Sequence, residues 1–295
     1  MFPPELWDRC LDFLHDDPAA LRACAVVCRD WLPACTHHIF STLAVFQDGE
    51  DLPSSAPALS FGRLCALIET NPALVGHVRT LRTHQCTNGL TSVVLGVLGG
   101  PNSRIRSLAL DTQPDVFCES PFDSCLPDKF PHLRSLSLQN VLFDSLGALA
   151  AQLHPLRSLK RLDLRHVLLS NTYPPQEPFP APAFEDCEVS LAVNNWAMET
   201  SLSIFWPWLS AFSPQLRVVS LDLVGLRISD EGEPGRELDA LAALLDIHNA
   251  SLKTLNLGLR DRGGEHARVV LAELALCSAL EHLAITASVP CPVEQ

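Results

Sequence analysis

Cysteine and histidine residues near the N-terminus have a spacing that could hold a metal ion. Cys24 and Cys28 stand four positions apart, which places both thiols on one face of a helix, and Cys35, His37 and His38 follow closely. Zinc sites normally take two close pairs of ligands from turns, with a long spacer between the pairs. Because this cluster does not have that arrangement, we expect buried thiols here and no metal site.

The sequence contains none of the common motifs of catalytic chemistry. It has no nucleophile elbow (G-x-S-x-G), dinucleotide fingerprint (G-x-G-x-x-G), P-loop or metalloprotease helix (H-E-x-x-H). The glycine pairs Gly99-Gly100 and Gly263-Gly264 lack the flanking Lys, Ser or Thr of a phosphate loop and are typical of turns. A hydrolase using Cys and His needs a nucleophile, a base and a group that orients the base, and no such set is visible. We therefore expect a protein that is not an enzyme, with no catalytic residues and no cofactor.

Charge and composition exclude several other classes of protein. The 295 residues include 34 acidic and 21 basic side chains, for a formal charge of −13, whereas nucleic-acid binding requires clustered Lys and Arg. An apolar fraction of 47% excludes disorder of the whole chain, and the longest weakly polar stretch, 90–100, is too short to cross a bilayer. The N-terminus lacks the features of a signal peptide, and the eleven cysteines are scattered singly. We expect no nucleic-acid or membrane partner, reduced thiols, and a cytoplasmic and/or nuclear location.

Residues 1–46 are predicted to form a small helical domain. Apolar residues recur at helical spacing over 6–14, and Asp17 with Pro18 supplies the N-cap and the first turn of a second helix. This second helix is expected to run to about residue 32, where Pro33 ends it or starts the next piece. Three short helices have a small core for independent stability, so such a unit usually needs a partner surface.

Beyond an acidic, Pro- and Ser-rich linker at 47–58, the pattern L-x-x-L-x-L recurs. Its first positions fall at 78, 105, 133, 159, 216, 252 and 280, so most spacings are 26–28 residues. The gap of 57 residues after position 159 predicts a degenerate copy at Phe184, Cys187 and Val189. A period of 20–29 residues with this pattern is the signature of leucine-rich repeats.

Each copy predicts one short strand and one return segment. Side chains alternate along a strand, so L-x-L places two apolar side chains on the same face. Helical returns are expected at 146–153, 238–247 and 269–276. Stacked copies bury a continuous core that no single copy could form. We predict an α/β repeat fold: a three-helix domain at 1–46, followed at 59–295 by a leucine-rich-repeat solenoid of about seven to eight irregular copies, a curved parallel sheet with helices or irregular returns on its convex side.

Two segments interrupt the repeats. Residues 173–182 are proline-rich, which excludes a helix or a central strand, and 229–235 form an acidic loop. Such insertions lie on one edge of a solenoid, either as tolerated decoration or as binding loops. The tail at 290–295 makes no evident capping helix, so we expect the last strand to be exposed.

The residues between the leucines are expected on the concave face of the sheet. They occupy the third, fifth and seventh positions of each copy and are mainly small and polar, which suits a shallow binding surface. We expect substrate binding at ten of these positions: Arg82, His84, Asp111, Gln139, Arg161, Asp163, Arg165, Asp222, Asn256 and His282.

Three arginines stand out on this face of an acidic protein. Arginine is enriched in binding hot spots, so one hypothesis is that Arg82, Arg161 and Arg165 contact an acidic or phosphorylated ligand. The alternative is that Arg161 and Arg165 form a charge ladder with Asp163 across the sheet. The sequence leaves both open.

The first 40 residues resemble the F-box motif. Phe2-Pro3-Pro4-Glu5-Leu6 stands where that family has Leu-Pro-x-Glu-Leu, with Phe2 replacing the usual Leu. Val27-Cys28-Arg29-Asp30-Trp31 corresponds to the family's Val-Cys-basic-x-Trp signature, whereas Trp7-Asp8 stands where Leu-Leu or Ile-Leu is common. Leucine-rich repeats are a familiar companion of the motif, and the acidic linker is similar to that of fungal members.

This resemblance implies docking to a ubiquitin ligase. F-box proteins bind the Skp-type adaptor of a cullin–RING ligase and present a protein substrate through their second domain, so the chain would be a non-catalytic substrate-recognition subunit. The match places eight residues at or near the adaptor-binding surface: Pro3, Leu6, Leu11, Leu14, Leu21, Val27, Cys28 and Trp31. Some of these must instead face the internal core, because core packing also selects apolar residues.

An alternative of another class is a leucine-rich-repeat interaction scaffold whose N-terminal helices only cap the solenoid. Terminal repeats need capping, which gives this alternative a physical basis. The two differ in whether the apolar side chains of residues 3–31 are exposed or covered by the first repeat.

Overall fold

A computed structural model describes residues 4–47, 58–112, 126–171, 182–193, 202–212, 215–223, 235–259, 272 and 274–287. The chain divides into two compact units. The described part of the first unit covers residues up to 112 together with 126–133, and that of the second begins at residue 134. The predicted linker falls almost entirely outside the described residues, as do the insertions at 173–182 and 229–235, except Pro182 and Gly235.

The chain begins with three helices, α1 (Pro4–Asp12), α2 (Pro18–Val27) and α3 (Leu32–Ser41). The predicted start of α2 is confirmed, because the Asp17 carboxylate accepts hydrogen bonds from the backbone N–H groups of Ala19 and Ala20 at 3.0 and 2.9 Å. The helix ends earlier than predicted, since the extended backbone of Cys28 interrupts it. Pro33 then belongs to the first turn of α3.

The three helices share a small core of their own. Leu11, Leu21 and Cys35 are buried at its centre. Six partly buried residues pack around these three: Leu14, Cys24, Ala25, Trp31, Ala34 and Ile39. Trp7 lies against Trp31, with ring centroids 4.8 Å apart. The helices therefore have a defined packing, although few side chains are fully buried.

The first unit continues as a parallel sheet in the order β2-β1-β3-β4. Its strands are β1 (Thr42–Phe46), β2 (Ala58–Ser60), β3 (Thr80–Cys86) and β4 (Ser107–Thr112). Its further helices are α4 (Phe61–Thr70), the 3-10 helix η1 (Pro72–His77), α5 (Asn88–Leu98) and α6 (Leu126–Lys129). Strand β1 was not predicted; it follows α3 directly, and its alternating Leu43 and Val45 are buried.

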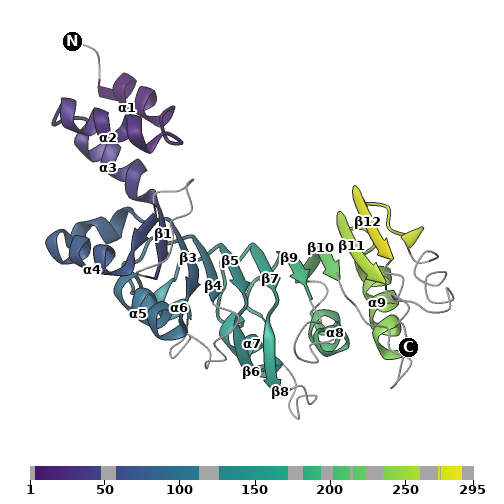
Figure 1. Ribbon diagram of the computed structural model, residues 1–295. Coiled ribbons are helices and arrows are strands. Elements are labelled where there is room, and N and C mark those ends of the chain that lie inside the picture. Colours follow the sequence, from purple (N-terminus) through teal and green to yellow (C-terminus); the bar gives the residue numbers. More distant parts are fainter. Residues whose placement is uncertain are drawn as a thin grey trace, which may run out of the picture. The chain divides into compact units, whose positions relative to one another are not determined.

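The second unit holds a parallel sheet in the order β5-β7-β9-β10-β11-β12. The strands are β5 (Ser135–Gln139), β7 (Arg161–Arg165), β9 (Cys187–Ala192), β10 (Leu216–Leu223), β11 (Thr254–Leu259) and β12 (His282–Ala287). Between them come α7 (Leu146–Leu153), α8 (Leu202–Ala211) and α9 (Gly235–His248), on one side of the sheet in Figure 1. Strands β6 (Leu142–Ser145) and β8 (Leu168–Asn171) form a separate parallel pair.

These elements confirm the predicted α/β class, with parallel strands and helices in alternation. The helical returns expected at 146–153 and 238–247 are present as α7 and as part of α9. The third expected return, 269–276, lies mostly outside the described residues. The sequence pattern worked here because most strands place two apolar side chains on one face, and burial of each such side chain stabilises the fold by about 1.5–3 kcal/mol.

In strand β9 the sheet register differs from the predicted copy by two residues. The sequence placed the repeat at Phe184, Cys187 and Val189. In the sheet, Val189 and Leu191 lie beside the two leucines of β7, so they take the L-x-L positions. A slip of two residues keeps the same side chains on the same face, and Cys187, Val189 and Leu191 are all buried, so apolar alternation alone does not fix the register.

In strand β10 the register also differs from the predicted copy by two residues, but for another reason. The sequence assigned Val219 and Leu221 to the core, but the register places Leu221 and Leu223 beside the L-x-L residues of β11. An irregularity between Val218 and Ser220 leaves Val219 half-buried beside the ladder. A β-bulge adds one residue to a strand and thereby resets the alternation of its faces.

Leucines at equivalent positions of different strands should contribute unequally to the free energy of unfolding. Leu162 is fully buried in β7, whereas Leu283, at the equivalent position of β12, is 47% exposed. Leu162→Ala should lower the free energy of unfolding by about 2–5 kcal/mol, since it removes buried methyl groups and leaves a cavity. Leu283→Ala should cost less than about 1 kcal/mol in the same urea titration. Equal losses at the two sites would contradict this packing.

His248, in the last turn of α9, should make stability depend on pH. Its side chain is buried, its Nε2 has no hydrogen-bond partner in the described part of the chain, and burial lowers its pKa to about 4. The unfolded chain therefore takes up this proton as the pH falls from 6.5 to 4 while the folded chain does not, so stability falls over that window.

His248→Leu should remove that part of the acid sensitivity. At full effect the histidine accounts for a loss of about 3 kcal/mol between pH 6.5 and pH 4. Urea unfolding of the wild type and the variant at pH 7, 5.5 and 4 measures the difference in slope. If both proteins lost stability in parallel, His248 would not be the titrating group.

Candidate functional site

Large apolar side chains are exposed on the three N-terminal helices. Five of them are between 45% and 87% exposed: Leu6, Phe13, Val26, Val27 and Leu32. They come from α1, the turn after it, the end of α2 and the start of α3. Exposed apolar side chains that gather in a patch are typical of interaction sites in proteins. We call these five residues the helical apolar surface.

The predicted adaptor-binding residues divide between this surface and the core beneath it. Leu6 and Val27 belong to the helical apolar surface. Leu11 and Leu21 are buried in the helical core, so they hold the helices together and present no side chain to a partner. Leu14 and Trp31 pack against that core, Cys28 is half-buried, and Pro3 lies outside the described residues.

Sequence reasoning missed Phe13, Val26 and Leu32. Phe13 falls in the turn that follows α1, where a helical pattern no longer states which way a side chain points. Val26 precedes Val27, which was assigned to the F-box-like signature, and Leu32 begins α3, whose first residue the sequence did not define. The boundaries of the helices would have been needed to find them.

The cysteine and histidine residues of the sequence cluster lie at different places among helices α1–α3. Cys35 is buried, which raises the pKa of its thiol, and Cys24 packs against the same core. His38 Nε2 lies 2.9 Å from Oδ1 of Asp12, while the ring of His37 lies edge-on to the rings of His38 and His77, with centroids 5.5 and 5.8 Å apart. Within the described ranges no group of three or more His, Cys, Asp or Glu residues could hold a metal ion.

The predicted substrate-binding residues lie on strands, alternating with the buried leucines. Five are exposed (Arg82, His84, Arg161, Arg165 and His282), and five are half-buried (Asp111, Gln139, Asp163, Asp222 and Asn256). In the first unit, His84 Nδ1 lies 3.1 Å from Oδ2 of Asp111 on the neighbouring strand. Arg82, beside them, forms no ion pair with any described residue.

In the second unit the strand face carries a ladder of charges. Arg165 Nε donates hydrogen bonds to both carboxylate oxygens of Asp163, at 3.1 and 3.0 Å. Glu188 of β9 lies between Arg161 and Arg217, 3.8 and 3.6 Å from their guanidinium nitrogens. These pairs favour the charge-ladder alternative for Arg161 and Arg165 over a free anion site.

The ladder borders a hollow of about 400 Å³ where β5, β7, β9 and β10 begin. Arg217 Nε donates a 2.7 Å hydrogen bond to Asp186, a residue that the repeat pattern did not single out. Basic Arg134 and Lys160 line the same hollow. Positive and negative groups alternate there, so the hollow has no single sign of charge.

No protein-family model matches this chain, and no curated protein matches it either. None of the described helices is long and apolar enough to cross a membrane.

The charge ladder should contribute little to stability. Exposed ion pairs are worth about 0–1 kcal/mol, because water screens them and ordering the side chains costs entropy. The double variant Arg161→Gln, Arg165→Gln should therefore unfold within about 1 kcal/mol of the wild type in urea. A loss comparable to that of a buried leucine variant would show that these arginines hold the sheet together.

Proposed function

We propose that this chain is the non-catalytic substrate-recognition subunit of a Skp–cullin–F-box ubiquitin ligase. Helices α1–α3 act as the F-box and dock on a Skp-type adaptor. The parallel strands that follow act as a curved leucine-rich-repeat solenoid, and their polar face binds a substrate protein.

The helical apolar surface is the observation that carries this proposal. Phe13, Val26 and Val27 are each at least 70% exposed, although the same helices bury Leu11 and Leu21 well. Hydrophobic surface is worth about 25 cal/mol per Å² when it leaves water, so covering such side chains supplies binding free energy. A partner that covers these side chains gains the hydrophobic free energy that the small core of the helices does not.

The residues of the F-box-like signature support the same proposal. Val27-Cys28-Arg29-Asp30-Trp31 spans the end of α2 and the turn into α3. Within it, Val27 faces water, whereas Trp31 packs on the helical core and against Trp7. The signature thus combines one exposed apolar group with an aromatic residue that fixes the turn.

The capping scaffold has an observation in its favour as well. Helix α3 runs directly into β1, and the backbone N–H of Arg79 donates a 2.8 Å hydrogen bond to the carbonyl of Ser41. Helix α3 also contacts η1. This attachment suits a cap, but a cap has no need of Phe13 and Val26 in water, so the exposed side chains favour docking.

Docking should depend on the exposed residues of α1 and α2. Val27→Asp and Phe13→Asp, each made in the full chain, should reduce co-purification with a Skp-type adaptor by tenfold or more, because each places a carboxylate in an apolar interface. Leu11→Asp is unsuitable as a test, since it would unfold the helical core.

Val93→Asp provides a matched control, because Val93 is also exposed but lies on α5. It should bind the adaptor as the wild type does, and circular dichroism should show that all three variants are folded. A folded wild type that forms no complex would favour the capping scaffold. Full binding by both Val27→Asp and Phe13→Asp would rule out this docking surface.

A further inference from the structure

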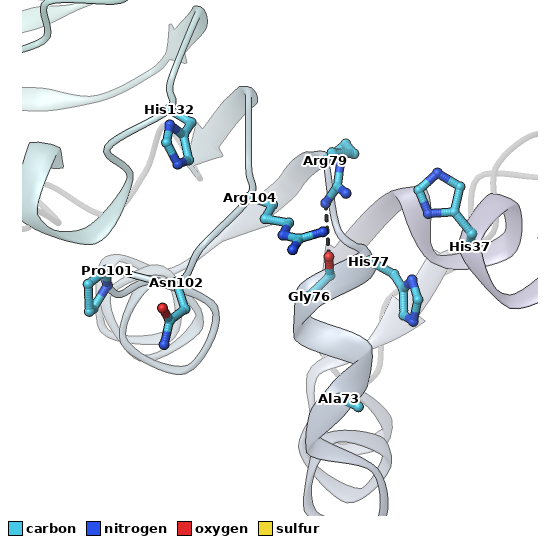
Figure 2. A pocket seen from close by; sticks show the side chains of 9 residues that line it. All are labelled: His37, Ala73, Gly76, His77, Arg79, Pro101, Asn102, Arg104 and His132. Carbon is cyan, nitrogen blue, oxygen red and sulfur yellow. Dashed lines mark hydrogen bonds between the residues drawn. The ribbon is translucent and has the colours of Figure 1, made fainter. Parts of the chain in front are cut away.

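A basic cavity of about 670 Å³ lies in the first unit and shares no residue with the helical apolar surface (Figure 2). Its lining comes from α3, from η1, and from the segments that lead into β3, β4 and β5. The nine lining residues are His37, Ala73, Gly76, His77, Arg79, Pro101, Asn102, Arg104 and His132. The volume is within the range of small-molecule sites, but the lining is polar.

The charge of this lining is all of one sign. It includes two arginines and three histidines and no Asp or Glu. Figure 2 shows Arg79 and Arg104 in the middle of the lining, with His37 and His77 on one side and His132 on the other. No described carboxylate forms an ion pair with Arg79 or Arg104. Such an uncompensated cluster is unusual in a chain with a formal charge of −13.

Arg79 is held in place by groups that do not neutralise it. Its guanidinium donates to the carbonyl oxygens of Gly76 and Val78, at 2.9 and 3.3 Å. Burial, together with the neighbouring Arg104 and Arg106, lowers its pKa. The fold therefore fixes one arginine beside two others at an electrostatic cost, and an anion in the cavity would remove that cost.

Histidine side chains line the cavity beside the two arginines. Burial lowers the pKa of His37, and Arg79, His38 and His77 lower it further, whereas Asp12 raises it. Gly100, with φ at +139°, makes the turn from which Pro101 and Asn102 reach the cavity. Histidine and arginine side chains together offer several N–H donors around one space.

We propose that this cavity binds a phosphoryl group, carried either by a phosphorylated side chain of a protein or by a free phosphate compound. Arginine matches the oxygens of phosphate with charge-assisted hydrogen bonds, and a phosphoryl dianion has three strong acceptor oxygens for the donors that line the cavity. At physiological salt the Debye length is about 8 Å, so the local arginines outweigh the distant acidic residues. The proposal does not depend on adaptor docking.

Calorimetric titration of the full chain at low salt tests it with defined probes. Pyrophosphate represents a free phosphate compound, and N-acetyl-phosphoserine amide represents a phosphorylated side chain, with N-acetylserine amide as its uncharged counterpart. We expect at least one phosphorylated probe to bind, more weakly as salt is raised, and the serine compound not to bind. Tighter binding of one phosphorylated probe identifies which source the cavity prefers.

Arg104→Gln is the decisive variant, because the Arg104 side chain is exposed and no described hydrogen bond of the fold uses it. This variant should raise the dissociation constant of the bound probe tenfold or more, and Arg79→Gln should raise it at least as much. Arg63→Gln, on α4 and outside the cavity, should bind as the wild type does. Absence of binding to the wild type, unchanged binding by folded Arg104→Gln, or an equal loss in Arg63→Gln would overturn the proposal.

Discussion

Rows of apolar side chains in register across parallel strands are the constraint on which the rest of this structure depends. A strand of five to eight residues cannot bury its own leucines, but Leu136, Leu162 and Val189 come together when β5, β7 and β9 pair. Once these rows occupy one face, alternation leaves the intervening polar residues on the other face. The segments that lead into the strands are brought together at one edge by the same pairing.

The same geometry gives the arginines of this chain two different environments. Arg161 and Arg217 pair with carboxylates on or just before the neighbouring strand β9, and Arg165 pairs with Asp163 of its own strand, so all three are compensated within the sheet. Arg79 and Arg104 lie in segments between helix and strand, where no described carboxylate is close. We therefore assign the ladder to the sheet itself and the basic cavity to a ligand.

The sequence was informative wherever one local rule decides the structure. The leucine pattern located most strands and two returns, and the Asp17-Pro18 pair located the start of α2. It failed where tertiary pairing decides: β9 and β10 slipped by two residues, and β1 had no motif. The basic cavity was out of reach because its residues come from separate segments, none of which carries a pattern.

Hydrogen–deuterium exchange of the full chain, with and without a purified Skp-type adaptor, tests the central claim most directly. Our account predicts that the adaptor slows exchange in α1, α2 and the turn into α3, while exchange in the strands of the second unit is unchanged. Protection centred on the strands, or no protection in the helices under conditions where the two proteins form a complex, would contradict the assignment of the helical apolar surface as the docking site.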